Sequence, residues 1–252
     1  MDLPIYIINL DKYNTKYKQS YSILKKQGFE NINRISAIDG TTLSDPFQYI
    51  TFHTQFLIDN PEYRCSHQQL NTLGGIGCYL SHVKCWKELL ISDYPGVLIF
   101  EDDLQLIPNF KEEYLKMIEN IPSDCDVLSF GYLKLFNKQK FKNPIELVRS
   151  EYYGNQAYYI TRNGAKTLLT KAFPIEIQID GYMSLMNYYS YINIYFTKQT
   201  LVTQHNPTGS SINYVTCYKC YLPNSNMSKE WIILILFLIT LCFILLILKQ
   251  IM

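Results

Sequence analysis

Short apolar runs alternate with segments of helical periodicity along most of the chain, and this alternation restricts the fold more than any other feature. Residues 97–100 form an uninterrupted apolar run of strand length, and apolar residues within 74–91 recur every three or four positions, as on one face of a helix. The same criteria predict strands over 4–10, 32–37, 97–100, 126–130, 156–160, 192–196 and 201–203, and helices over 15–27, 74–91, 108–118, 163–172 and 181–189. The sequence therefore predicts an α/β layer fold with a mostly parallel sheet, interrupted by an irregular insertion over 39–72.

The charge balance argues against a nucleic-acid partner. The 23 Lys and Arg residues and 22 Asp and Glu residues leave a formal charge of +1, so the chain lacks the basic excess that nucleic-acid binding requires. Aromatic residues make up 15% of the 252 residues, which excludes a disordered chain. The length outside the C-terminal tail is sufficient for one sizeable core.

The C-terminal tail contains a second constraint, an apolar stretch at 231–248 without a charged residue. A helix of this length rises about 27 Å, just enough to cross the hydrocarbon core of a bilayer. The alternative is a buried C-terminal helix, although core helices usually keep a polar face. Because no signal-like run opens the sequence, we expect a single-pass tail anchor with the folded part in the cytosol. The expected organisation is a catalytic domain over 1–221, a polar linker over 222–230 and a transmembrane helix over 231–248.

The cysteines indicate a reducing compartment. There are seven of them, an odd number, and they are scattered without a disulfide framework of the secreted type. Cys217 and Cys220 form a Cys-x-x-Cys pair shortly before the apolar stretch. This pair is half of a zinc site, a redox pair or two incidental thiols, and no second pair follows it.

Three adjacent acids mark the place where the chemistry is expected. Glu101, Asp102 and Asp103 directly follow the apolar run 97–100, and ligands of open α/β sheets bind beyond the carboxyl ends of the strands. Adjacent carboxylates repel one another and are costly to desolvate without a cation. Such a cluster can hold a hard divalent cation, which in turn holds a phosphate. The alternative is an acidic turn exposed to solvent.

A series of short motifs extends through nearly the whole part before the tail. In chain order they are Tyr6-Ile-Ile-Asn9-Leu10-Asp11, Ser36-Ala-Ile-Asp39-Gly40, Gly77-Cys-Tyr-Leu-Ser81-His82-Val-Lys-Cys-Trp86, Phe100-Glu101-Asp102-Asp103, Gly154 with Ala157-Tyr158, Gly164-Ala165, Ile179-Asp180 and Val202-Thr203-Gln204. Each motif alone is weak, but their order resembles that of glycosyltransferase family 25, which includes lipopolysaccharide-processing enzymes and procollagen galactosyltransferases.

The resemblance implies a GT-A-like, Rossmann-like nucleotide-sugar-binding domain. It also implies a UDP-sugar donor, with UDP-galactose or UDP-glucose favoured, a Mn²⁺ ion and inverting transfer. One departure concerns the segment after Asp11, where the family commonly has Arg. This chain has Lys12 and Lys16 there, and Lys keeps the charge but lacks the planar fork of Arg.

Within this implied chemistry, particular residues can be given expected roles from their position and type. Asp103 is expected to contact the metal directly, with Glu101 and His205 as further ligands. Asp102 is expected to contact metal-bound water, ribose or the donor sugar, and Asp180 to act as the catalytic base that inversion requires. The residues expected to bind the donor are Asn9, Asp39, Ser81, His82, Lys84, Glu101 and Gln204.

Each of these roles has a structural alternative. Asn9 and His205 can be turn residues, His82 a packed core histidine and Lys84 part of a solvated face. Asp180 fits equally well as the N-cap of a helix over 181–189, in which case Glu176 is the next candidate for the base. Trp86 is interpreted as a core residue rather than a platform for sugar.

The sequence therefore predicts a tail-anchored, metal-dependent glycosyltransferase that transfers a hexose from a UDP-sugar to a glycan or protein hydroxyl. The acceptor stays open between a lipid-linked glycan, a protein hydroxylysine and a surface polysaccharide. The first alternative is a catalytically inactive, membrane-anchored carbohydrate-binding or scaffold protein on the same fold. The second is a metal-dependent phosphohydrolase.

Overall fold

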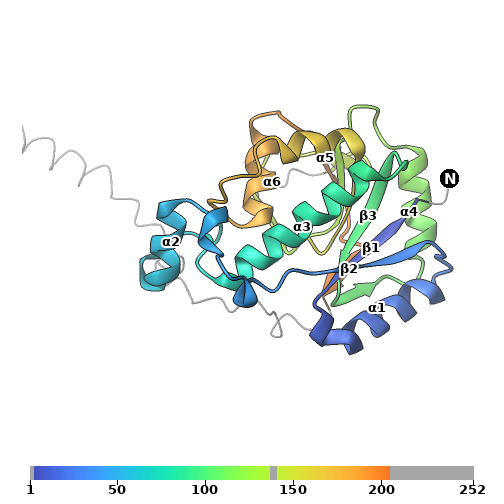
Figure 1. Cartoon of the computed structure of the whole chain (residues 1–252). Helices are drawn as coiled ribbons and strands as arrows, with labels where there is room; N and C mark the ends of the chain where they lie inside the picture. The colour runs from blue at the N-terminus through green and yellow to red at the C-terminus, as the bar shows by residue number, and fades with distance from the viewer. Residues whose placement is uncertain (1–2, 137–140, 205–252) are drawn as a thin grey trace, which may run out of the picture.

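The computed structural model describes residues 3–136 and 141–204. Their fold is organised around one seven-stranded sheet with the strand order β2-β1-β3-β9-β5-β10-β7 (Figure 1). Its strands are β1 (Ile5–Asn9), β2 (Ile32–Ser36), β3 (Gly96–Glu101), β5 (Val127–Gly131), β7 (Ile145–Leu147), β9 (Ala157–Thr161) and β10 (Ile194–Thr197). Two small ribbons pair β4 (Leu104–Leu106) with β11 (Val202–Gln204) and β6 (Lys134–Leu135) with β8 (Tyr152–Tyr153). The helices are α1 (Asn14–Lys26), α2 (Phe52–Asp59), α3 (Leu73–Ile91), α4 (Phe110–Glu119), α5 (Arg162–Leu169) and α6 (Ile179–Tyr188).

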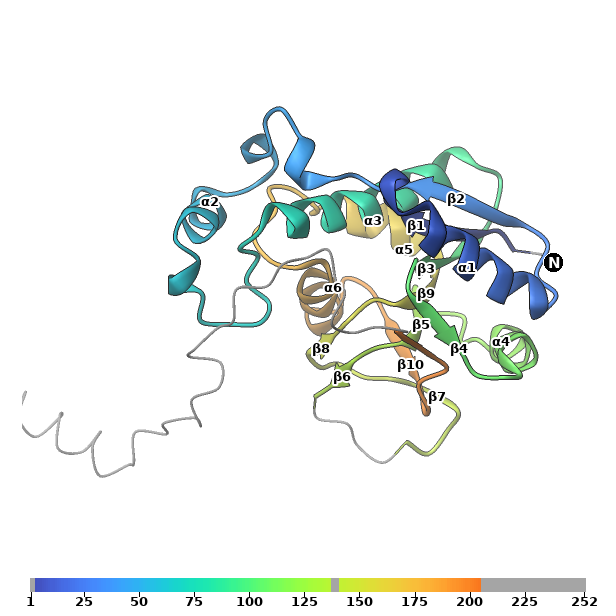
Figure 2. The ribbon, with the colours of Figure 1, turned by 90° about the horizontal axis from the view of Figure 1, so that it is seen from below.

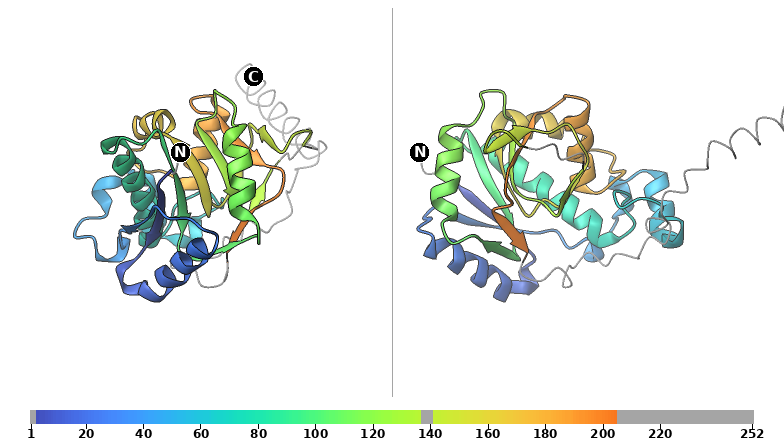
Figure 3. Two further views of the ribbon diagram at one scale, coloured as in Figure 1. Left: turned by 90° about the vertical axis from the view of Figure 1, so that its right-hand side faces the viewer. Right: turned by 180° about the vertical axis from the view of Figure 1, so that it is seen from behind.

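The sheet lies between two layers of helices, which confirms the predicted α/β class (Figure 2). Alternate residues of each strand point to opposite faces, so Ile8 and Ile99 belong to the core under α3, α5 and α6. Ile7 and Phe100 belong to the core under α1 and α4, the two helices that share the other face in Figure 3. The run at 97–100 in β3 is continuously apolar because both faces of the sheet are covered there.

The prediction of a mostly parallel sheet is wrong for half of the strand pairs. The pairs β1–β2, β1–β3 and β5–β10 are parallel, whereas β3–β9, β5–β9 and β7–β10 are antiparallel. A parallel neighbour needs a crossover, usually helical, to the opposite end of the sheet. After β5 the chain forms β7 at the far edge of the sheet and then returns to pair with β5 as β9, and the described residues of this segment contain no helix.

The insertion over 39–72 is less irregular than predicted, because it contains α2 and short 3-10 turns. Thr51 caps α2 by accepting a hydrogen bond of 3.2 Å from the backbone N–H of Thr54. Only Thr54 and Leu57 of this helix are buried, and Phe52 is 85% exposed. The apolar face is therefore too small to produce a helical pattern in the sequence.

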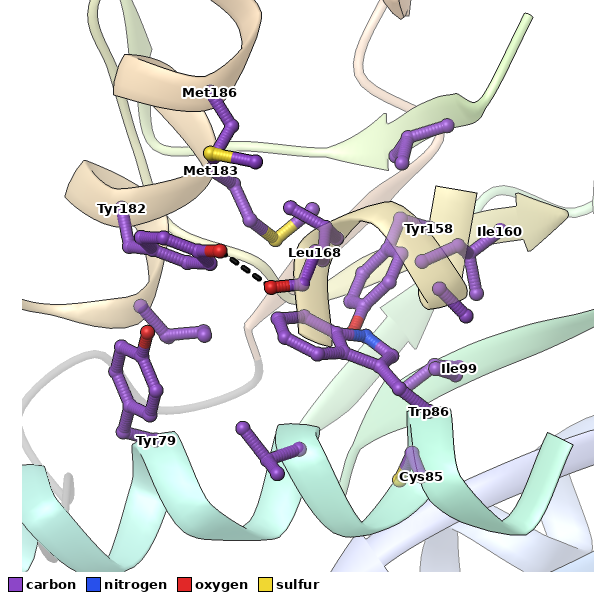
Figure 4. Close-up of a cluster of buried hydrophobic side chains, with 14 of the residues drawn as sticks. Tyr79, Cys85, Trp86, Ile99, Tyr158, Ile160, Leu168, Tyr182, Met183 and Met186 are labelled. Carbon is purple, nitrogen blue, oxygen red and sulfur yellow. Dashed lines mark hydrogen bonds between the residues drawn. The ribbon is translucent and has the colours of Figure 1, made fainter. Parts of the chain in front are cut away.

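Trp86 belongs to the core, as predicted, and no part of it is exposed. It lies on α3 with its ring against Tyr158 of β9 (Figure 4), and its indole N–H donates a hydrogen bond of 3.1 Å to the Tyr158 hydroxyl. In the same cluster the Tyr182 hydroxyl of α6 donates to the backbone oxygen of Leu168 on α5. These bonds satisfy the polar ends of large aromatic side chains inside the core.

Gly40 and Gly77 bring the loop after β2 into backbone contact with α3. A Cβ atom at Gly77 would lie 2.4 Å from the Ile38 oxygen and 2.5 Å from the Gly40 nitrogen. A Cβ atom at Gly40 would lie 1.8 Å from the Leu73 oxygen. Only glycine permits this approach, which fixes Asp39 beside the first turns of α3.

We expect Gly77→Ala to destabilise the protein by about 1–3 kcal/mol, because a methyl group would be forced into backbone. At an exposed helix position the same change would stabilise the protein by up to about 1 kcal/mol. The sign of the change in unfolding free energy therefore shows whether the close approach is present. Urea unfolding of the variant measures the change. Gly75→Ala is the matched control, since its Cβ would meet only side-chain atoms, the nearest at 3.1 Å. Equal stability of the two variants would contradict the close approach.

Several predictions for the C-terminal part lie outside the described residues. These are the linker at 222–230, the apolar stretch at 231–248, the Cys217–Cys220 pair and His205. Within residues 3–136 and 141–204, no helix combines the length and the apolarity needed to span a bilayer.

Candidate active site

Three parallel strands end at one edge of the sheet and deliver polar side chains there. The register pairs Asn9 with Ser36 and Ile8 with Glu101, so Asn9, Ser36 and Glu101 lie side by side at the carboxyl ends of β1, β2 and β3. A cleft of about 390 Å³ opens beyond this edge. It is lined by the strand ends, the start of α1, the loop after β2, the first turns of α3 and the turn between β3 and β4. The cleft therefore lies beyond the carboxyl ends of the strands, at the edge where the sequence analysis expects the site.

The acidic triplet lies along the wall of this cleft. Glu101 is the last residue of β3, and Asp102 and Asp103 form the turn before β4. The Oδ1 atom of Asp103 is buried and accepts no hydrogen bond from any described residue. Burial, with the charges of Glu101 and Asp102 added, raises the pKa of Asp103 to about 7. An unbonded carboxylate oxygen among hard oxygen donors fits a divalent cation such as Mn²⁺.

Asp102 has a different surrounding, formed by β1 and α1. The Asn9 side-chain amide donates a hydrogen bond to the Asp102 carboxylate. The Ser20 hydroxyl donates a hydrogen bond of 2.8 Å to the backbone oxygen of Asp102. The Asn9 amide also donates a hydrogen bond of 3.1 Å to the Tyr13 backbone oxygen, and its side-chain oxygen accepts one from the Arg34 guanidinium. The Asn9 amide is therefore engaged within the protein and positions Asp102, while its predicted contact with the donor stays a prediction.

Glu101 faces α3 and the β4–β11 ribbon. Gln204 pairs with Leu104 in this ribbon and donates a hydrogen bond of 3.4 Å to Glu101. On the other side, the Nε2 atom of His82 lies 3.6 Å from a Glu101 oxygen. Glu101, Gln204 and His82 were all predicted as site residues, and the structure brings them together.

Asp39 is held at the cleft by the loop that Gly40 fixes. It accepts a salt bridge of 2.5 Å from Lys12 and a hydrogen bond of 2.6 Å from the Thr41 hydroxyl. The bond with Lys12 is the main reason why the pKa of Asp39 falls to about 2. Asp39 is therefore charged at neutral pH and keeps the Lys12 ammonium at the cleft, where both residues are part of the lining.

The three predicted residues of α3 take different positions. Ser81 lines the cleft. Its hydroxyl accepts a hydrogen bond of 2.9 Å from the Ile38 N–H and donates one of 2.6 Å to the Gly77 backbone oxygen. His82 is completely buried behind the wall of the cleft. Lys84 donates a hydrogen bond of 2.9 Å to the Ser36 backbone oxygen. It is not among the described residues that line the cleft.

Asp180 is in the first turn of α6, whose N-cap is Gln178, so it does not cap this helix as the alternative interpretation required. Its two oxygens accept hydrogen bonds of 2.8 Å from the backbone N–H groups of Gly154 and Gly181. Gly154 has a left-handed φ of +88°. Burial raises the pKa of Asp180, and the charge of Glu101 adds to this, which places Asp180 within electrostatic reach of the acidic triplet. It does not line the cleft formed by the described residues.

Tyr13, Lys16 and Cys78 also line the cleft, although no site role was predicted for them from the sequence. Lys16 lies close enough to Asp102 and Asp103 to oppose the rise that burial causes in their pKa values. A signal for Cys78 was present, since it precedes His82 by four positions on a helix.

The fold and the site together define an α/β protein whose cleft at the strand ends combines an acidic cluster with Lys12 and Lys16. A sequence profile described as "Glycosyltransferase family 25 (LPS biosynthesis protein)" matches residues 2–183. The chain belongs to glycosyltransferase family 25, and the predicted family is confirmed.

Individual relatives give the same result. The chain is 28% identical over 191 residues to mouse procollagen galactosyltransferase 2, a match that covers 72% of this chain and 30% of that protein. It is 30% identical over 125 residues to the human inactive glycosyltransferase 25 family member 3, covering 46% of this chain and 20% of that protein. The chain thus spans less than a third of these relatives. Among solved structures, S. aureus TarS 1-349 in complex with UDP-GlcNAc superposes with a TM-score of 0.47 at 14% identity, covering 86% of this chain and 62% of that one.

Proposed function

We propose that the chain is a metal-dependent glycosyltransferase of GT-A-like fold. It transfers a hexose, galactose or glucose, from a UDP-sugar to a hydroxyl of a glycan or protein, with inversion at the anomeric carbon. The observation that carries the proposal is the acidic triplet in the cleft, where Asp103 keeps a buried oxygen without a hydrogen bond from the described residues. Membership of the family supports the class of reaction.

Some residues of the cleft are suited to bind the cation and others to bind the donor. Asp103 and Glu101 would hold the cation, and a bound Mn²⁺ would neutralise charge on the diphosphate leaving group. Lys12 and Lys16 place ammonium groups at the same cleft, where they attract an anionic donor. Asp102, fixed by Asn9, is directed to ribose, the donor sugar or metal-bound water.

The transfer step needs one group that takes a proton. The acceptor hydroxyl oxygen forms a bond to the anomeric carbon, and the bond from that carbon to the diphosphate oxygen breaks. UDP leaves with the bonding electrons, and the hydroxyl proton passes to a base. We assign this role to Asp180, whose raised pKa makes the carboxylate a stronger base than an exposed Asp.

Screening a panel of UDP-sugars for release of UDP by the full chain tests the function. We expect release from UDP-galactose or UDP-glucose at a rate at least about 10-fold higher with Mn²⁺ than with chelator. An inactive carbohydrate-binding protein releases no UDP from any sugar nucleotide. Release of UMP and sugar 1-phosphate, without UDP or free sugar, would instead indicate the phosphohydrolase.

We also propose that residues 231–248 anchor the chain in a membrane, with the catalytic domain on the cytosolic side. The support is the uncharged stretch in the sequence, which is long enough to cross a bilayer. Truncation after Ser228 should give a soluble protein with an unchanged thermal transition, because a spanning helix adds nothing to the domain core. Calorimetry of the truncated and full chains checks this. Aggregation or loss of the transition would instead make the stretch a core helix.

A further inference from the structure

Cys78, His82 and Glu101 form a cluster that the transfer mechanism does not use as a unit. Cys78 and His82 are one turn apart on α3, so their side chains point to the same side of the helix. Glu101 approaches them from the end of β3. A sulfur, a nitrogen and an oxygen, one from each residue, lie within 4.8 Å of one another.

His82 is arranged as a metal-bound histidine is in many proteins. Its Nδ1 atom shares a hydrogen bond of 2.8 Å with the Tyr158 hydroxyl, which fixes the orientation of the ring. Its Nε2 atom is buried and lacks a hydrogen-bond partner among the described residues. The side chain has no exposed surface, so a polar atom without a partner at this position is costly. A cation between His82 and Glu101 would satisfy it.

The spacing suits a tetrahedral ion. Zinc binds nitrogen and oxygen at about 2.0 Å, so two such ligands of a tetrahedral site are about 3.3 Å apart. The Nε2 atom of His82 lies 3.6 Å from the Glu101 oxygen. Cys78 and Glu101 both line the cleft, so a fourth ligand can enter from the solvent in the cleft. Three protein ligands with one open position are a common zinc arrangement.

The chemistry of the ligands separates this cluster from the acidic triplet. Thiolate and imidazole favour Zn²⁺ and Co²⁺, whereas Mg²⁺ and Mn²⁺ favour carboxylates and water. Burial holds the Cys78 thiol in its protonated form, and the charges of Glu101, Asp180 and Asp103 add to this. Coordination removes the thiol proton to solvent, because the ion replaces it as the positive partner of the sulfur.

We propose that Cys78, His82 and Glu101 form a zinc-binding site beside the acidic triplet. The site shares Glu101 with the predicted manganese ligands, so the two ions compete for that carboxylate. Binding of zinc does not depend on the proposed transferase function, and its test uses no turnover.

Cobalt titration of the full chain tests the proposal, because a bond between sulfur and Co²⁺ produces a charge-transfer absorption in the near ultraviolet. The parent protein carries Cys217→Ser and Cys220→Ser, which removes the other pair of thiols suited to a metal. In this metal-stripped parent we expect the absorption to saturate at one Co²⁺ per chain and to disappear when Zn²⁺ is added. Cys78→Ser should abolish it. Cys65→Ser is the matched control, since Cys65 is exposed and lies outside the cluster.

His82→Gln provides a second variant, which keeps the sulfur but removes the imidazole. We expect its affinity for Zn²⁺ to fall by more than about 10-fold in calorimetric titration, since changes in the surroundings of a ligand alone cost 10–100-fold. If Cys78→Ser does not fold, judged by its thermal transition, this variant decides the question. No cobalt absorption in the parent, or full absorption in a folded Cys78→Ser protein, would overturn the site, as would an unchanged zinc affinity in His82→Gln.

Discussion

Asp103→Asn is expected to abolish manganese-supported release of UDP and, at the same time, to raise the melting temperature of the metal-free protein. The first effect follows because an amide is a poor ligand for a hard cation. Losing about 3 kcal/mol of stabilisation of the leaving group corresponds to at least about 100-fold in rate. Rates measured with saturating UDP-sugar and Mn²⁺ check it, and an unchanged rate would remove the acidic triplet from the mechanism.

The second effect follows from the environment of Asp103. Its pKa rises from 3.8 to about 7, mainly through burial, so its ionised form destabilises the folded state. Between pH ~4 and ~7 the folded protein holds a proton that the unfolded chain has lost, and stability falls as the pH rises. Asn removes this dependence, because it does not ionise.

Melting curves in chelator, recorded from pH 4 to pH 8, measure the effect. The melting temperatures of wild type and Asp103→Asn should diverge as the pH rises towards about 7, with the variant the more stable of the two. Asp93→Asn is the matched control, since this aspartate is exposed, and it should show no divergence. A variant that is less stable than wild type at pH 8 would mean that the Asp103 carboxylate has a stabilising partner.

The strands and the position of the site follow directly from local sequence. Residues 97–100 are apolar because β3 is buried on both faces, and the acids after them must lie at the carboxyl edge wherever β3 is placed in the sheet. The motif glycines have a physical reason as well, since Gly40 and Gly77 permit a backbone contact that a side chain would prevent. These features need only the period of the pattern and the sterics of single residues.

Contacts between segments far apart in the chain could not be predicted from the local sequence pattern. Gln204 reaches Glu101 through the β4–β11 ribbon, which joins residues about a hundred positions apart. A strand near β11 was predicted, but the three residues of β4 leave almost no pattern, so the pairing was not predicted. The antiparallel entry of β9 depends on the path of the chain after β5, although the lack of a helical pattern over 132–155 was a usable signal. The partners of Asn9 and Asp180 depend on packing that only the folded chain defines.

Asp180→Asn is expected to lower the transfer rate by at least about 100-fold, the scale for removal of a general base. The structure adds a second effect, because both Asp180 oxygens accept backbone N–H groups, those of Gly154 and Gly181. Asn offers one oxygen and one NH₂ group, so one of these N–H groups loses its acceptor. This loss costs about 1–3 kcal/mol, which lowers the melting temperature by several degrees in a domain of this size.

The two effects are separated by measuring UDP release well below the melting transition, where the variant is fully folded. A purely structural Asp180 predicts a lower melting temperature with a normal rate under these conditions. A catalytic base predicts a rate loss that cooling does not restore, with the affinity for UDP-sugar and Mn²⁺ barely changed. Glu176→Gln is the matched control, because this residue is exposed three positions before α6. If Asp180→Asn transfers normally and Glu176→Gln does not, the base is Glu176, because the proton acceptor must be the carboxylate whose removal stops the reaction.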